Sequence, residues 1–270
     1  MTRLVLVFLL LGFASLSVAQ KRVAETETEK EGAKNYNQAI EAYSTGDYAK
    51  CIPLFSAADS LIGETGLVDR VKLRFALGMA YIKTDQPAAA LEQFEWVAGK
   101  DSTYPYVFYQ AAESARLLKQ TDKSVKYYNK ALETANDQDK AIILGKMARI
   151  EMGLGRLKPA LKQINQAISL TRVSSYYFLR GQIVDRMAQL LDRAENDNFN
   201  YEEAIRNGRI TEEKMLEATE LRESALADYE IATEDEKLVA TCQKLIERNK
   251  IIIENNRQVI SEIIYLRENP

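Results

Sequence analysis

The sequence Leu-Gly-Met-Ala-Tyr occupies residues 77–81 and is followed by Ala90 and Phe94. It combines small and large residues at helical spacing. Gly78 and Ala90 would let two antiparallel helices approach closely, while Tyr81 and Phe94 would fill the space beside them. One such hairpin cannot bury its apolar face alone. We therefore expect it to stack on further copies of itself.

Pairs of a small residue and a large residue four positions later recur along the chain. They are Cys51 and Phe55, Ala90 and Phe94, Ser124 and Tyr128, Ala160 and Ile164, and Ala225 and Tyr229. The small members are separated by 39, 34, 36 and 65 residues in turn. The middle steps indicate a regular repeat, and the first and last indicate additional chain within their units.

The order Leu-Gly-x-x-Tyr and then Ala-x-x-x-Phe resembles the 34-residue tetratricopeptide repeat, a helix-turn-helix unit. The resemblance implies an all-α fold, namely a right-handed solenoid of about five helical hairpins over residues 33–232. The third unit is expected at residues 105–138. Because stacked units of this family form a concave surface that holds other molecules, the resemblance also implies a protein-binding scaffold.

The fifth unit is longer than the others. Its first-helix small residue, Gly181, lies 44 positions before Ala225, whereas the corresponding positions of a standard unit are 12 apart. We therefore predict an insertion near residues 190–222, built as two elongated helices. The tip, at Asn196–Ile210, could act as a docking arm.

The C-terminal segment, residues 233–270, predicts one long helix. Thr233 and Glu236 have the spacing of a capping box that would start it. Apolar residues and two asparagines then recur at heptad spacing: Leu238, Cys242, Leu245, Asn249, Ile252, Asn256, Val259, Ile263 and Leu266. The helix could cap the stack, which is the preferred interpretation, or form a homo-oligomer through residues 238–266, where polar seam residues would set the register.

The N-terminus predicts export. Arg3 precedes an apolar run, and small residues end at Ala19, so residues 1–19 have the form of a secretory signal peptide. Residues 20–32 form a charged segment expected to be a flexible leader. We expect no membrane span after signal cleavage. Among exported proteins with this repeat, the chain resembles bacterial periplasmic assembly factors, which implies a periplasmic or cell-envelope location.

Composition argues against most catalytic and nucleic-acid functions. The chain of 270 residues has a net charge of -3 and no histidine. Nucleic-acid binding usually needs a basic face, and imidazole bases and ligands are absent. No catalytic, cofactor or metal motif is present, so we expect no enzyme activity; a hydrolase using a carboxylate pair is the remote alternative. Cys51 and Cys242 are expected to be buried thiols.

The family resemblance also indicates which residues would line the concave groove and hold a protein or peptide partner. Aromatic rings mixed with basic side chains suit an extended peptide that carries carboxylates. The alternative for the rings is packing between helices. The candidate groove residues are Tyr36, Tyr43, Phe75, Lys83, Tyr106, Tyr109, Glu113, Arg116, Arg149, Phe178 and Gln182, with Lys72, Gly145 and Asp185 at neighbouring groove positions.

Overall fold

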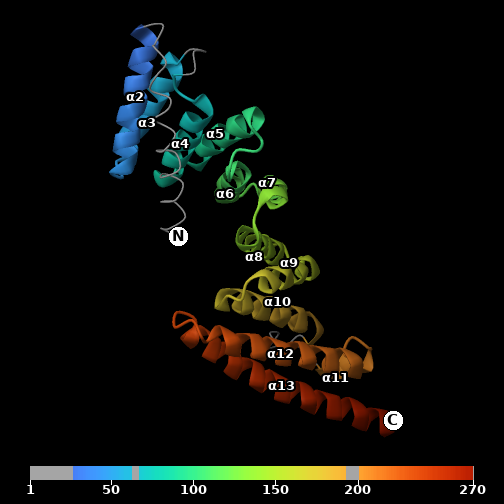
Figure 1. Ribbon diagram of the computed structural model, residues 1–270. Helices are drawn as coiled ribbons and strands as arrows, with labels where there is room; N and C mark the ends of the chain where they lie inside the picture. Colours follow the sequence, from blue (N-terminus) through green and yellow to red (C-terminus); the bar gives the residue numbers. More distant parts are fainter. Residues whose placement is uncertain (1–26, 63–66, 193–200, 270) are drawn as a thin grey trace. The chain divides into compact units, whose positions relative to one another are not determined.

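The computed structural model describes residues 27–62, 67–192 and 201–269 (Figure 1). Within these ranges the regular structure is entirely α-helical, with no strand. The chain divides into two compact units, Met1–Thr134 and Ala135–Pro270. The predicted signal peptide lies outside the described residues.

The first unit consists of three antiparallel helical hairpins. Its helices are α2 (Glu27–Ser44), α3 (Tyr48–Leu61), α4 (Arg70–Lys83), α5 (Pro87–Lys100), α6 (Val107–Leu117) and α7 (Thr121–Thr134). Each hairpin pairs an even-numbered helix with the helix that follows it, and α3 contacts α4 as α5 contacts α6. This arrangement buries two apolar clusters within the unit, and the partly buried Met79 and Tyr81 pack against both.

The second unit contains a standard hairpin, an elongated hairpin and a final long helix. Its helices are α8 (Asp137–Gly153), α9 (Leu157–Leu170), α10 (Ser174–Asp192), α11 (Tyr201–Arg206), α12 (Glu212–Ala232) and α13 (Val239–Glu268). Helix α10 pairs with α12, and α13 runs along α12 (Figure 1). The all-α fold of stacked hairpins predicted from the sequence is confirmed.

Side-chain caps set where several helices begin. Asp69 accepts hydrogen bonds from the backbone N–H groups of Val71 and Lys72, the first turn of α4. Asp47, Asn136 and Thr211 cap α3, α8 and α12 in the same manner. These bonds satisfy donors that have no partner within the helix.

The small and large residues of the repeated pattern form the centre of each hairpin. All ten members of the five pairs, from Cys51 to Tyr229, are completely buried. A Cβ atom added at Gly78 would lie 2.8 Å from the ring of Phe94, and one added at Gly181 would lie 2.7 Å from the ring of Tyr229. Glycine at these positions is therefore what allows the ring of the second helix to touch the backbone of the first.

Two predicted boundaries differ from the structure. Helix α2 begins at Glu27, so the end of the predicted leader belongs to the first hairpin. The C-terminal helix begins at Val239 rather than Thr233. Thr233 adopts right-handed helical angles and donates its hydroxyl to the carbonyl of Glu230, so it closes α12 instead of starting α13.

The part of the insertion tip that the structure describes is folded against α13. Ala204 and Ile210, on either side of the turn at Gly208, are buried together with Met215. Val259, Ile260 and Ile263 of α13 pack against this cluster. Residues 196–200 of the predicted tip lie outside the described residues. From Tyr201 onward the insertion is part of a core, which argues against a freely projecting arm.

The predicted heptad seam of α13 faces inward. Cys242 and Asn249 are fully buried and Asn256 is 2% exposed. The amide of Asn249 accepts a hydrogen bond from Arg222 on α12, at 2.7 Å, and that of Asn256 donates to Asp192 on α10, at 3.2 Å. The seam is thus taken up within the chain, as the capping interpretation expects.

Candidate binding surface

The aromatic residues at the predicted groove positions contact large residues of the second helix in their own hairpin. The ring centroids are 6.0 Å apart for Tyr36 and Phe55, 5.4 Å for Phe75 and Phe94, 6.2 Å for Tyr109 and Tyr128, and 6.0 Å for Phe178 and Tyr229. The first-helix ring of each pair is only partly buried. Each therefore packs on the core with one part and leaves another part at the surface.

Tyr104 extends this aromatic surface, although the sequence did not single it out. Its ring lies 4.8 Å from that of Phe75. Burial, and then the negative charge of Asp69, raises the pKa of Tyr104 to about 12. The same two causes raise the pKa of Tyr36. Tyrosine hydroxyls are ordinarily protonated at neutral pH, and the raised pKa extends this range further into alkaline solution. Asp69, directly before α4, was recognisable as a capping residue, but its proximity to both rings was not.

Charged groups of the first unit border these rings. Lys72 and Lys83 of α4 are exposed. On α6, Arg116 pairs with Glu113 at 3.0 Å, and the hydroxyl of Tyr128 donates to the same carboxylate. The hydrogen bond to Glu113 raises the pKa of Arg116. Glu113 is thus committed to two donors of this chain. Lys72 forms an exposed ion pair with Asp69 at 3.7 Å, while Lys83 is exposed at the end of α4.

Tyr43 and Tyr106, both predicted to line the groove, differ from the other groove residues of the first unit in burial and in backbone conformation. Tyr43 is 8% exposed, with its ring 5.2 Å from that of Tyr48, so it belongs to the core of the first hairpin and does not line an open groove. Burial raises its pKa to about 12. Tyr106 is half-buried and precedes α6 with a φ of 62°, in the left-handed region that non-glycine residues rarely adopt.

The second unit presents a different set of groove positions. Arg149 is exposed, and Gln182 is half-buried. Gly145 has no side chain at its groove position. A Cβ atom added there would lie 2.9 Å from the ring of Tyr176 on α10, so this ring occupies the space beside Gly145. Asp185 is 4% exposed and pairs with Arg222 at 2.6 Å, so it belongs to the interior.

Within the described ranges no group of three acidic or cysteine side chains could hold a metal ion. Cys51 and Cys242 are buried free thiols, as predicted. Among the helices that the structure describes, none has the length and apolar character needed to cross a bilayer.

The tetratricopeptide-repeat family model matches residues 105–138, the range predicted for the third unit and occupied by α6 and α7. Residues 105–138 are a tetratricopeptide repeat. The crystal structure of MamA is similar over 75% of this chain and 96% of that one, with 14% identity and a TM-score of 0.56. MamA from Desulfovibrio magneticus RS-1 is similar over 64% and 92%, with 14% identity and a TM-score of 0.52.

YrrB, described as a TPR protein with an unusual peptide-binding site, is similar over 78% of this chain and 90% of that one. Its identity is 15% and its TM-score 0.53. No curated protein sequence matches the chain. At these identities the likeness establishes the tetratricopeptide-repeat fold and nothing finer. Scaffolds of this fold present extended surfaces to protein partners and are generally not enzymes.

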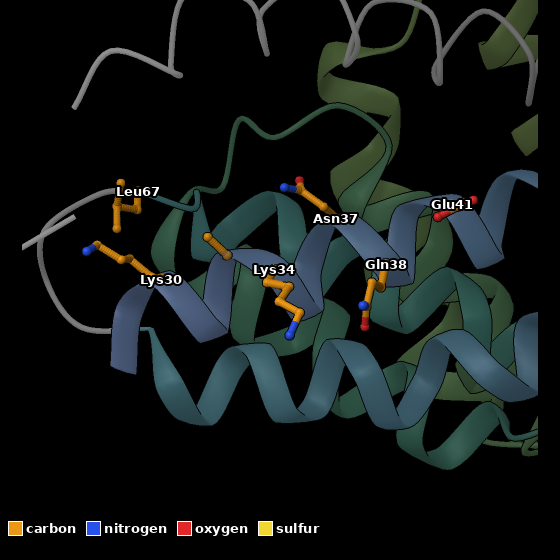
Figure 2. A pocket seen from close by; sticks show the side chains of 7 residues that line it. Lys30, Lys34, Asn37, Gln38, Glu41 and Leu67 are labelled. Atoms are coloured by element: carbon orange, nitrogen blue, oxygen red, sulfur yellow. The ribbon is translucent and has the colours of Figure 1, made fainter. Parts of the chain in front are cut away.

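The repeat register also explains a hollow of about 430 Å³ along α2. Figure 2 shows Lys30, Lys34, Asn37, Gln38 and Glu41 on this helix, with Leu67 near Lys30. When Tyr36 of the first unit is aligned with Phe75 of the second, Lys34, Gln38 and Glu41 each have an equivalent residue on α4. The equivalent residues of α4 are Leu73, Leu77 and Ala80, all buried against the first hairpin. This face of α2 is polar where that of α4 is apolar, which is typical of a surface helix, so we do not assign the hollow to a ligand.

Proposed function

We propose that this chain is a non-enzymatic scaffold of the cell envelope that holds a protein or peptide segment on the first-helix surface of its tetratricopeptide stack. The observation that carries the proposal is the linked aromatic surface of the first unit, where Phe75 contacts Tyr104. The helix that carries Phe75, α4, also carries the exposed Lys72 and Lys83. Partly buried rings offer apolar contact area without loss of side-chain freedom on binding, because the core already fixes them.

The chemistry of this surface favours an acidic partner segment with apolar or aromatic side chains. Lys72 and Lys83 can form charge-assisted hydrogen bonds with carboxylates. The hydroxyls of Tyr36 and Tyr104 are protonated at neutral pH and can also donate hydrogen bonds. Peptide binding by YrrB, a protein of the same fold, supports a peptide ligand as the class of partner.

The envelope location is supported by the signal-like residues 1–19. The direct test is to sequence the N-terminus of the protein recovered from the native cell and to fractionate the compartments. Cleavage after Ala19 with recovery outside the cytoplasm is expected. An intact N-terminus in the cytoplasmic fraction would reject this part of the proposal.

The binding surface is tested by capture from envelope extract with the chain and with Lys72→Glu/Lys83→Glu. We expect this variant to lose the partner by about tenfold or more, since it repels the carboxylates that the wild type attracts. Lys50→Glu/Lys126→Glu is the matched control, because it makes the same charge change at exposed positions of second helices. Equal capture by all three proteins would remove the surface from consideration.

A further inference from the structure

Surface charge is strongly segregated in the second unit. Residues 140–186 contain nine Lys or Arg and two acidic residues in a chain whose net charge is -3. Those two acids, Glu151 and Asp185, are 6% and 4% exposed, and they pair with Arg156 and Arg222. Every charged side chain that reaches the surface between Lys140 and Arg186 is therefore a cation.

The outer face of α9 concentrates part of this charge in a line. Lys158 and Lys162 are exposed and one helical turn apart, and the line continues through Ser169 to Arg172 just beyond the helix. None of the three cations forms an ion pair with any residue that the structure describes. At 1.5 Å per residue the line is about 21 Å long. We call these residues the basic stripe.

The outer face of α12 has the opposite charge. Glu213, Glu217 and Glu220 are exposed at helical spacing on one face, and we call them the acidic stripe. The cations of α12 do not neutralise them. Arg222 is fully buried, and Lys214 donates to the carbonyl of Arg209. The stripe spans about 11 Å along the helix, roughly half the length of its basic counterpart.

The two stripes belong to helices on either side of α10 in the same unit. Arg180 of α10 bonds to Asn165 on α9 at 3.2 Å and to Asp228 on α12 at 2.6 Å. Leu161 of α9 also packs against the cluster that contains Ala225 and Tyr229 of α12. A rotation of a second copy by 180° can therefore bring both pairs of opposite stripes together at once.

We propose that a second copy of this chain docks here, with the basic stripe of each copy on the acidic stripe of the other. The proposal does not depend on the proposed function. It differs from self-association through residues 238–266, whose seam residues are already used within the chain. Helix faces of these lengths bury less than the standard size of stable interfaces, so the dimer is weak and sensitive to salt.

The test is sedimentation velocity of the purified chain over about a hundredfold range of concentration. A monomer–dimer equilibrium is expected at about 50 mM salt, with the dissociation constant raised about tenfold or more at about 500 mM salt. Lys158→Glu/Lys162→Glu and Glu217→Lys/Glu220→Lys should each be monomeric. The controls with the same charge changes elsewhere, Lys50→Glu/Lys126→Glu and Glu92→Lys/Glu133→Lys, should dimerise as the wild type does.

The decisive experiment mixes the two monomeric variants. One variant then carries two acidic faces and the other two basic faces, so a heterodimer should form although neither variant pairs with itself. A wild-type chain that stays monomeric would overturn the proposal. So would a dimer that survives either reversal, a dimer lost in the control variants, or a mixture that contains monomers only.

Discussion

The guanidinium of Arg222 on α12 donates to the carboxylate of Asp192 on α10 at 2.6 Å, and neither side chain is exposed to solvent. The same guanidinium reaches Asp185 at 2.6 Å and the amide of Asn249 on α13 at 2.7 Å. One buried cation thus joins the three long helices of the second unit. Because a buried ion without partners is very costly, these bonds fix how α13 lies on the elongated hairpin.

Arg222→Leu should destabilise the chain by about 3–5 kcal/mol, since it leaves two buried carboxylates without their main partner. Urea unfolding followed by far-UV circular dichroism measures the loss. The control is Arg257→Leu, because Arg257 forms an exposed ion pair with Glu223 at 3.2 Å. That change should cost less than about 1 kcal/mol. Equal losses in the two variants would show that the buried network does not hold α13.

Gly78→Ala tests the close approach within the second hairpin. The new methyl group would meet the buried ring of Phe94 at 2.8 Å, so we expect a destabilisation of about 1–3 kcal/mol from overpacking. Gly99→Ala, near the end of α5, meets nothing within 4 Å and should be neutral or stabilising by up to about 1 kcal/mol. Thermal unfolding of both variants gives the comparison, and a stable Gly78→Ala protein would contradict the proposed packing.

Cys51 provides a test in alkaline solution. Burial, and then the charge of Asp47, raises the pKa of its thiol from 9.0 to about 11. Between these values the unfolded chain loses the thiol proton and the folded chain keeps it, so stability falls as the pH rises through this window. Cys51→Ala introduces alanine, the residue at the equivalent position of three other units, Ala90, Ala160 and Ala225. It should unfold like the wild type at pH 7 and lose less stability by about pH 11.

The contradicting result for Cys51 is an identical loss of stability in both proteins over that window. A separate check is the rate of reaction with a thiol reagent at neutral pH. A fully buried, protonated thiol should react at least about a hundredfold more slowly in the folded chain than in urea.

The repeated core was predictable because it is local. A small residue and a large residue four positions apart lie on one helix face, so the pairs from Cys51–Phe55 to Ala225–Tyr229 could be identified without any knowledge of distant contacts. Even the unusual step from Gly181 to Ala225 was read correctly, since the Gly181 backbone touches Tyr229. The residue spacing alone therefore identifies which positions pair within a hairpin.

The misjudged features depend on contacts that spacing does not encode. Thr233 and Glu236 fit a capping box, yet the backbone there completes the preceding helix. Asn249 and Asn256 were recognised as polar seam residues, but their partners Arg222 and Asp192 lie on other helices. Tyr104 joins the aromatic surface only through the stacking of α6 on the second hairpin. Tyr43, predicted at the groove, is turned into the core by the same kind of tertiary packing.

Photo-crosslinking in the native cell can show whether the first-helix surface holds a partner. A photoreactive phenylalanine analogue would replace Lys83 on the first-helix surface or, as control, Lys126 on the outer face of α7; both lysines are exposed. We predict a discrete crosslinked partner from position 83 and none from position 126. Crosslinks from position 126 alone, or the same product from both positions, would contradict a ligand held on the first-helix surface.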